Sequence, residues 1–357
     1  MNIQKISEIG YFFSSNIPDL EVADATSPTG ISIELGETDI FDETLYEEED
    51  GVIWLRDVPS LINPFIDKSI KTLSIEFDKS SSTEIDEAII LPCRSTIKEL
   101  IGNEAQITNF LDINFLSIAK NFSVEKDDTF KLSFYFNNLV NPEIEYTCLY
   151  KRDGQYKTFD GITTLPDEAE DDYVLVSYSH DSVQTFLDEY SDDVTWEEFV
   201  CLSLTVGKRT IRVHKARQKS SAKFRFENSF FQEELLNLGG IISKSPDLEI
   251  TSAYIGTKHK NVKVEDEVSY TMKTGPLSED EVNALTDMAK AENAWIVING
   301  NKVPIAVSEF KLNYSNDNTE FKSAEFSFHR TENWSTDISG DMVTTKIADL
   351  TFDRSFN

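Results

Sequence analysis

The stretch Lys219–Gly240 reads KSSAKFRFENSFFQEELLNLGG and decides how the second half of the chain begins to fold. It opens with strict alternation, with Phe224 and Phe226 on one side and Arg225 on the other. A period of two is typical of a half-buried β-strand, because successive side chains point to opposite faces of a sheet. The stretch then turns into a phenylalanine-rich, acidic loop that ends at two glycines. We therefore predict a strand that opens into a loop.

The same alternation recurs along the chain. It appears at residues 31–35 (ISIEL), 72–77 (TLSIEF), 131–136 (KLSFYF), 223–228 (KFRFEN) and 324–329 (AEFSFH). More continuous apolar segments at 173–178 and 295–298 predict strands buried on both faces. The Asn299–Gly300 pair predicts a hairpin, and Pro304 predicts an edge or a bulge in its second strand. The fold class we predict is mainly β, with two domains resembling β-sandwiches or β-barrels and a few short helices.

Helical patterns are few. The strongest runs from Leu277 to Asn293, where Ser278 and Glu281 have the spacing of a capping box. Two shorter candidates are Ser182–Tyr190 and Thr195–Val200. These three segments are the helices that we predict.

Composition limits the kind of protein this can be. The chain has 357 residues, 39% of them hydrophobic, and a formal net charge of −31, which predicts a soluble protein that repels nucleic acids and anionic lipids. Three distant cysteines show no zinc-binding spacing, which indicates a reducing compartment. The first residues lack the pattern of a secretory signal, and no apolar run could span a membrane. We therefore expect a protein that is made in a cytoplasm.

A change in charge marks the predicted domain boundary. Residues 207–225 contain eight of the 33 Lys and Arg residues and no Asp or Glu, whereas acidic loops dominate before them. We place an N-terminal β-rich domain with acidic loops and short helices at 1–206 and a basic connector at 207–222. A C-terminal β domain with one helix follows at 223–335, and a C-terminal arm at 336–357.

The basic segment has three possible roles. It could meet acidic loops of a neighbouring copy, it could be an interdomain segment neutralised within its own chain, or it could bind nucleic acid, which the net charge disfavours. The segment also alternates, so it is either a strand with a basic face or an extended connector. The predicted subunit interface consists of Lys208, Arg209, Arg212, Lys215, Arg217, Lys219, Phe230 and Phe231. The two phenylalanines fit the core of their own domain equally well.

A search for catalytic motifs finds none. The segment around His180 (YSHDS) cannot form a triad, because adjacent residues on a strand face opposite ways. Carboxylates in solvated loops keep ordinary pKa values and make poor acids at neutral pH. The acidic loop at 167–172 lacks the spacing of an EF-hand, which leaves calcium binding there an open possibility. We predict no enzymatic activity, no cofactor and no specific metal site.

The sequence resembles tail structural proteins of phages and prophages of Bacteroidetes bacteria. The resemblance covers residues 220–332 best and 30–70 more loosely. It is carried by AKFRFENSFFQEELLNLGG at 222–240, TGPLSEDEV leading into the predicted helix, YSNDN at 314–318, AEFSFHR at 324–330, and the segment 39–66. It implies a β-rich tail component whose subunits form a ring or lie at the tail tip.

These observations lead to one functional expectation and one alternative. We expect a non-enzymatic virion structural protein, a tail component of the distal-tail, tail-tip or adaptor type that assembles into a symmetric oligomer. Its partners would be other copies of itself and neighbouring tail proteins, with no nucleic acid and no membrane. The alternative is a monomeric β module that binds carbohydrate or another partner, for which Trp54, Trp196 and Trp334 are the candidate contact residues.

Overall fold

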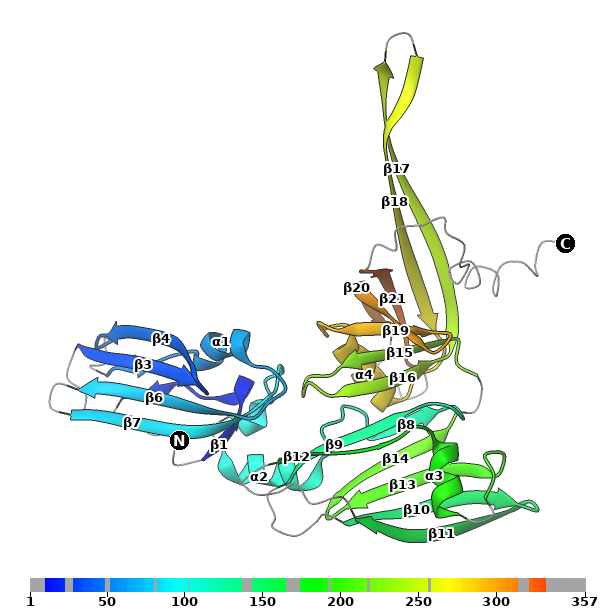
Figure 1. The fold of residues 1–357 in the computed structure, drawn as a ribbon, viewed down its shortest axis with the longest axis horizontal. Coiled ribbons are helices and arrows are strands. Elements are labelled where there is room, and N and C mark those ends of the chain that lie inside the picture. The colour runs from blue at the N-terminus through cyan, green and yellow to red at the C-terminus, as the bar shows by residue number, and fades with distance from the viewer. Residues whose placement is uncertain are drawn as a thin grey trace.

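Three successive bodies make up the chain in the computed structural model (Figure 1). The structure describes residues 10–22, 28–48, 52–79, 82–101, 103–136, 143–164, 174–191, 194–216, 219–255, 258–313 and 321–331. We name the N-terminal body (10–113), the middle body (114–216) and the C-terminal body (219–331). Each is centred on its own sheet and hydrophobic core. The predictions for Arg217, Trp334, the acidic loop at 167–172 and the C-terminal arm at 336–357 lie outside the described residues.

The N-terminal body is a five-stranded sheet with one buried face. Its strand order is β1 (Tyr11–Phe13), β7 (Ser82–Leu91), β6 (Lys71–Lys79), β3 (Thr29–Leu35) and β4 (Thr38–Leu45). Smaller elements complete it: the strand pair β2 (Leu20–Glu21) and β5 (Trp54–Leu55), the helices α1 (Val58–Ile62) and α2 (Glu104–Ile113), and 3-10 turns at Ser14–Asn16, Asn63–Phe65 and Lys98–Leu100. In β3 the odd-numbered residues are buried, as the alternation predicts.

The middle body has a second five-stranded sheet. Its order is β11 (Gln155–Thr164), β10 (Glu143–Arg152), β13 (Phe199–Val206), β14 (Arg209–Lys215) and β8 (Asn121–Val124). A separate strand pair, β9 (Phe130–Phe136) and β12 (Val174–His180), and the helix α3 (Val183–Tyr190) contribute to the same core.

The C-terminal body is a seven-stranded sheet. Its order is β16 (Glu233–Leu238), β15 (Ala222–Glu227), β19 (Ala294–Ile298), β20 (Asn301–Asn313), β21 (Ser323–Arg330), β18 (Lys258–Thr274) and β17 (Gly240–Ile255). The helix α4 (Glu279–Met288) buries Val282, Leu285 and Met288, two of which join the core of this sheet. The strands β17 and β18 extend far beyond the sheet as a long hairpin (Figure 1).

The predicted mainly β fold with short helices is confirmed. Each alternating segment lies in a strand, apart from Asn228, which follows β15. The two continuous apolar segments are also strands, β12 over its described residues and β19, but most of their residues are only half-buried, so the predicted burial on both faces is wrong. The predicted hairpin joins β19 to β20, with Asn299 and Gly300 both at positive φ (50° and 83°), the conformation that an Asn-Gly turn favours. β20 does contain a bulge, but it lies at the register shift between Val307 and Glu309, and Pro304 itself pairs in register with Trp295. No sheet among the described strands closes into a barrel.

Two of the three predicted helices are confirmed. α4 begins after Ser278, and both hydrogen bonds of its capping box to Glu281 are present. α3 follows Ser182, whose hydroxyl accepts a hydrogen bond from the Thr185 N–H. The prediction at Thr195–Val200 is wrong. Thr195 and Glu198 do make the expected contacts, but they close a single turn, because the next residues enter β13.

The predicted domain boundaries need correction. Residues 1–206 do not form one domain, since their described part contains two sheets with separate cores. The predicted connector 207–222 is largely structural: Arg209–Lys215 is the strand β14, which pairs with β13 and with β8. The alternation in this segment was therefore the signal of a strand, and the high positive charge of the segment favoured the wrong interpretation as a connector. Only residues 216–221 link the middle body to β15.

Candidate functional site

The exposed cations of the basic run lie on the middle body and at the start of the C-terminal body. Lys208 and Lys219 are exposed, and so is Arg212 on β14. The Lys208 Nζ lies 3.7 Å from the Asp112 Oδ2, a surface ion pair that contributes little to stability. Of the predicted interface, these three residues face solvent.

Two other cations of the predicted interface are taken up inside the chain. The buried Arg209 donates from Nη2 to the Tyr135 carbonyl at 3.1 Å, and its guanidinium lies 5.2 Å from the centre of the Phe134 ring. The Lys215 Nζ donates to the carbonyls of Trp196 and Glu197 at 2.7 and 2.9 Å. Partial burial lowers the pKa of Lys215. Both side chains stabilise the middle body and cannot reach a neighbouring subunit without breaking these contacts.

The last two cations of the run form a charged seam between the middle and C-terminal bodies. The Lys223 Nζ lies 2.5 Å from the Asp128 Oδ1 and 2.9 Å from the Glu125 Oε2. Arg225 donates to Glu233 at 2.8 Å and to the Thr129 carbonyl at 3.0 Å. We call Glu125, Asp128, Lys223, Arg225 and Glu233 the charged seam.

Two acids of the charged seam, Glu125 and Glu233, are held in the ionised form. Burial by itself would raise the pKa of Glu125, but hydrogen bonds from Ser220 and Lys223 outweigh it and lower that pKa. For Glu233, Lys302 and Arg225 likewise outweigh burial and lower the pKa. Because the opposite charges meet within one chain, the C-terminal part of the basic run is neutralised internally.

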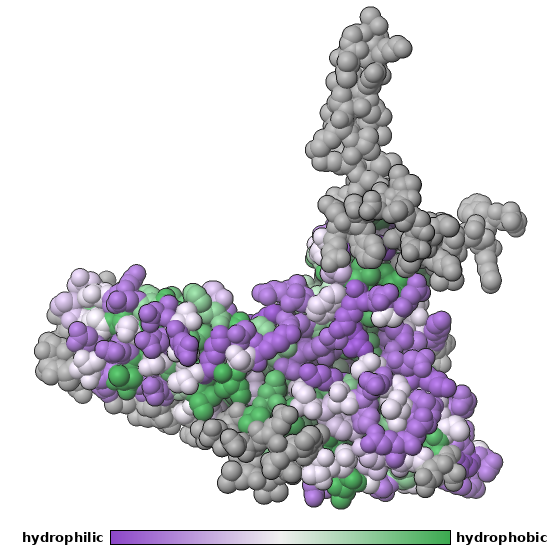
Figure 2. Space-filling view, in the orientation of Figure 1, coloured by the Kyte–Doolittle hydropathy of each residue, from purple (hydrophilic) through white to green (hydrophobic). Residues whose placement is uncertain are grey.

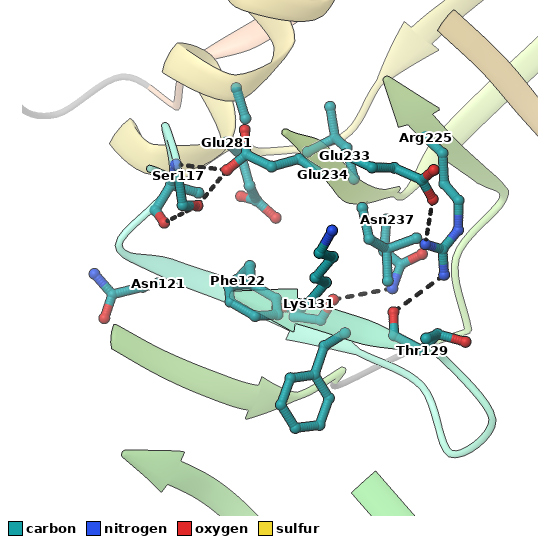
Figure 3. A pocket seen from close by; sticks show the side chains of 16 residues that line it. Ser117, Asn121, Phe122, Thr129, Lys131, Arg225, Glu233, Glu234, Asn237 and Glu281 are labelled. Atoms are coloured by element: carbon teal, nitrogen blue, oxygen red, sulfur yellow. Dashed lines mark hydrogen bonds and ion pairs between the residues drawn. The ribbon is translucent and has the colours of Figure 1, made fainter. Parts of the chain in front are cut away.

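A small cavity lies beside the charged seam, lined by β8, β9, β15, β16 and α4 (Figure 3). Its volume of about 30 Å³ has room for one or two water molecules and is too small for an organic substrate. Glu234 and Glu233 are neighbours on β16, so they extend in opposite directions, Glu234 toward Ser117 and Glu233 toward Arg225 (Figure 3).

Glu234 links the edge strand β16 by hydrogen bonds to the segment that precedes β8. One carboxyl oxygen, Oε1, accepts from the Ser117 hydroxyl, from the Ile118 N–H at 2.8 Å and from the Ala119 N–H at 3.3 Å. The other, Oε2, is buried without a hydrogen-bond partner among the described residues. Burial of the carboxyl group raises the pKa of Glu234 to about 7. The residue therefore positions two bodies and has no substrate-sized space in front of it.

The loop after β15 places Phe230 in the core of the N-terminal body. The buried Asn228 organises the loop: its Oδ1 accepts from the N–H groups of Phe230 and Gln232, and its Nδ2 donates to the Leu116 carbonyl. The Phe230 ring then packs against Phe13 at 5.8 Å and Phe110 at 5.8 Å between centroids. Phe230 thus joins the C-terminal body to the N-terminal one.

Phe231 is buried at the same junction. Its backbone has φ of 58°, a left-handed conformation that is rare for a bulky residue, and the Arg94 guanidinium lies 4.2 Å from the centre of its ring. Arg94 also pairs with the buried Glu227 at 2.8 Å, and Glu227 accepts from Asn293 as well. Both phenylalanines are therefore buried within the chain, and Phe230 packs in the core of the N-terminal body instead of the core of its own domain.

The hairpin of β17 and β18 is the feature that sequence reasoning missed. The two strands have 16 and 17 residues and pair along their whole length, with one register shift between Thr251 and Ser252. Only Ser269–Lys273 of β18 also pairs with β21. We call residues 246–268 of this hairpin the arm, which is a different segment from the predicted C-terminal arm at 336–357. Among the described strands, the two strands of the arm pair only with each other. An apolar–polar alternation and the Gly256–Thr257 pair were the signals that could have found it.

The described residues contain little that resembles a catalytic or ligand site. They hold no cluster of His, Cys, Asp or Glu that could bind a metal ion. His180 lies 2.6 Å from the Tyr178 hydroxyl and stacks on Phe130, within an aromatic cluster. Trp54 and Trp196 are half-buried in different bodies, and a cation lies over each ring. These two rings therefore form no shared carbohydrate platform.

The comparisons with known proteins leave the family of this chain open. No protein-family model matches the sequence. No curated protein matches it either. In the described part of the structure, no helix is long and apolar enough to cross a membrane.

Proposed function

We propose that this chain is a non-enzymatic structural component of a phage or phage-like tail, and that it assembles into a symmetric oligomer. The observation that supports self-assembly most strongly is the arm. The attribution to a tail rests on the resemblance of residues 220–332 and on the β-rich architecture.

The arm is difficult to explain in a chain that acts alone. A two-stranded hairpin is only marginally stable in water, because it has no second layer on which to bury a face. The outer edge of each of its two strands also offers unpaired N–H and C=O groups, which readily pair with other chains. With a rise of about 3.3 Å per residue, the ten or so paired residues in each strand of the arm extend about 33 Å. A neighbouring subunit would supply the missing surface.

The rest of the surface is consistent with a structural role. Hydrophilic residues dominate the visible face of the middle and C-terminal bodies (Figure 2). The cavity of about 30 Å³ beside the charged seam is too small for a substrate. A larger open hollow of about 710 Å³ is lined in part by the charged seam, whose charged groups pair with one another and hold the bodies together. The charged seam therefore supports a stable scaffold from which the arm projects.

Self-assembly can be tested by the native mass of the purified full-length chain. A monomer has a mass of 40.6 kDa, and we expect light scattering at about 50 mM salt to show a discrete multiple of it. The matched variant replaces residues 248–266 by Asn-Gly, which closes the hairpin between the paired residues Asp247 and Glu267. We expect this arm-deleted variant to be monomeric and folded. A wild-type chain that stays monomeric at every concentration, alone and with its neighbouring tail proteins, would contradict the proposal.

A further inference from the structure

Charge is unevenly distributed along the arm. Residues 250–264, the basic tip, contain Lys258, Lys260, Lys263 and one histidine, and no Asp or Glu. The residues next to the basic tip, toward the body, are acidic: Asp247, Glu249, Glu265, Asp266 and Glu267. The strand register places Lys260 opposite Ala253 and Lys263 opposite Thr251. A chain with a net charge of −31 thus carries three lysines at the end of its most extended element.

The sheet of the N-terminal body has an outer face of the opposite charge. Its inward face contributes Ile31, Ile33, Leu73 and Ile75 to the core. Its outward positions on β3, β4, β6 and β7 include six exposed acids, which we call the acidic face: Glu34, Asp39, Asp42, Glu76, Asp78 and Glu87. The exposed Ile85 lies among them, opposite Glu76.

The acidic face carries like charges at neighbouring positions. Glu34 lies directly opposite Asp39 across β3 and β4, and Ser74 separates Glu34 from Glu87. Like charges opposite each other destabilise a sheet. Among the described residues, none of these six carboxylates forms an ion pair, whereas the acids of the charged seam do. A cationic partner would relieve the repulsion across this face.

We infer that the basic tip of one copy docks on the acidic face of a second copy. This inference rests on the proposed self-assembly and names the two surfaces that meet. The arm extends away from the N-terminal body of its own chain (Figure 1), so its tip and its own acidic face lie apart. A second copy presents the same acidic face, and every subunit supplies one tip and one face.

The contact has a consequence for symmetry. Because the two surfaces are different, the contact is heterologous, and repeated contacts of this kind close into a ring or continue as a filament. A two-fold dimer would instead use the same patch on both copies. Charge complementarity also fixes the register of the contact, since the acidic segments at the base of the arm would repel the acidic face.

Charge reversal tests the contact, because the residues of the acidic face are exposed. The arm reversal is Lys258→Glu, Lys260→Glu and Lys263→Glu, and the face reversal is Glu76→Lys, Asp78→Lys and Glu87→Lys. We expect each to weaken self-association at about 50 mM salt by about tenfold or more, measured by sedimentation equilibrium. A chain that carries both reversals has complementary surfaces again, and we expect it to associate as the wild type does.

A matched control reverses three exposed acids of the middle body, Glu143, Glu145 and Asp160. It changes net charge as much as the face reversal, and we expect it to leave the association constant within about threefold. An oligomer that withstands the arm reversal, or a double reversal that stays dissociated, would overturn the docking inference while leaving self-assembly intact. A wild-type chain that never associates would overturn self-assembly itself. Loss of association in the control alone would place the contact on the middle body.

Discussion

Lys223 and Arg225 lie within ion-pair distance of acids in their own chain, whereas Lys258, Lys260 and Lys263 belong to the arm, which pairs only with itself among the described strands. The first group appears in the sequence as part of a dense basic run, and the second as a short cluster between two acidic segments. The denser group holds two bodies of one chain together. The density of cations along a sequence is therefore a poor guide to a subunit interface. Cations are available to a partner only where the fold of their own chain does not bring acidic side chains next to them.

The two regions should respond differently to mutation. Residues at the junction of the bodies should control folding stability, and residues of the arm should control association.

The largest effect is expected for Phe230→Ala. The ring is buried against Phe13 and Phe110, so its removal leaves a cavity in the junction and should lower the free energy of unfolding by about 3–5 kcal/mol. Denaturant unfolding measures the change. Phe321→Ala is the matched control, because that side chain is 80% exposed and its loss should cost less than about 0.5 kcal/mol. Equal effects of the two variants would contradict the placement of Phe230.

Glu234 should make the stability depend on pH. Burial raises its pKa from 4.5 in the unfolded chain to about 7 in the folded one. Below about pH 4.5 the carboxyl group is neutral in both states, so its contribution is fully present there. Stability is lost as pH rises toward about 7 and beyond, by about 3 kcal/mol in total at 1.36 kcal/mol per pKa unit.

The measurement compares the wild type with Glu234→Gln by urea unfolding from about pH 4.5 to 8. The difference in unfolding free energy between the two chains should shift by about 3 kcal/mol in favour of the variant as pH rises. Parallel pH profiles would show that the carboxyl group is not enclosed at the junction.

A smaller effect is expected for Glu227→Gln. This residue is buried, forms ion pairs with Lys68 and Arg94, and accepts a hydrogen bond from Asn293. Burial by itself would raise the pKa of Glu227, but these three partners outweigh that effect and lower the pKa. Removing its charge should lower the free energy of unfolding by about 2 kcal/mol, because Arg94 loses a buried partner and keeps the exposed Glu292.

Glu325→Gln is the control for that charge change. Its ion pair with Lys273 is largely exposed, so thermal or denaturant unfolding should change by less than about 1 kcal/mol. The contrast would disappear if the Glu227 cluster were open to solvent.

The smallest effect on stability is expected for deletion of the arm. The variant that replaces residues 248–266 by Asn-Gly keeps the pairing of β18 with β21, so its unfolding free energy should stay within about 0.5 kcal/mol of the wild type. The same variant should lose self-association. A large loss of stability in the monomer would mean that the arm belongs to the folding unit, and the division between the two regions would fail.

Local pattern was sufficient for much of the fold. Period-two alternation predicted β3, β6, β9, β15 and β21, because a strand with one buried face needs an apolar residue at every second position. Ser278 and Glu281 predicted the start of α4, because capping is a contact between residues three apart. The turn at Thr195 shows the limit: the same local signal was present, but only a single turn forms, because the residues that follow pair in β13.

Long-range contacts decided what local pattern could not. The sequence by itself determined a β-rich, acidic chain with a basic run, an Asn-Gly hairpin and two capped helices. Only the tertiary structure decided that β14 is an integral strand, that Phe230 packs on Phe13 more than two hundred positions earlier, and that the charged seam neutralises Lys223 and Arg225. The physical reason is that the charge and hydrophobicity of a residue are local properties. The partner that neutralises or buries it is chosen by how distant strands meet.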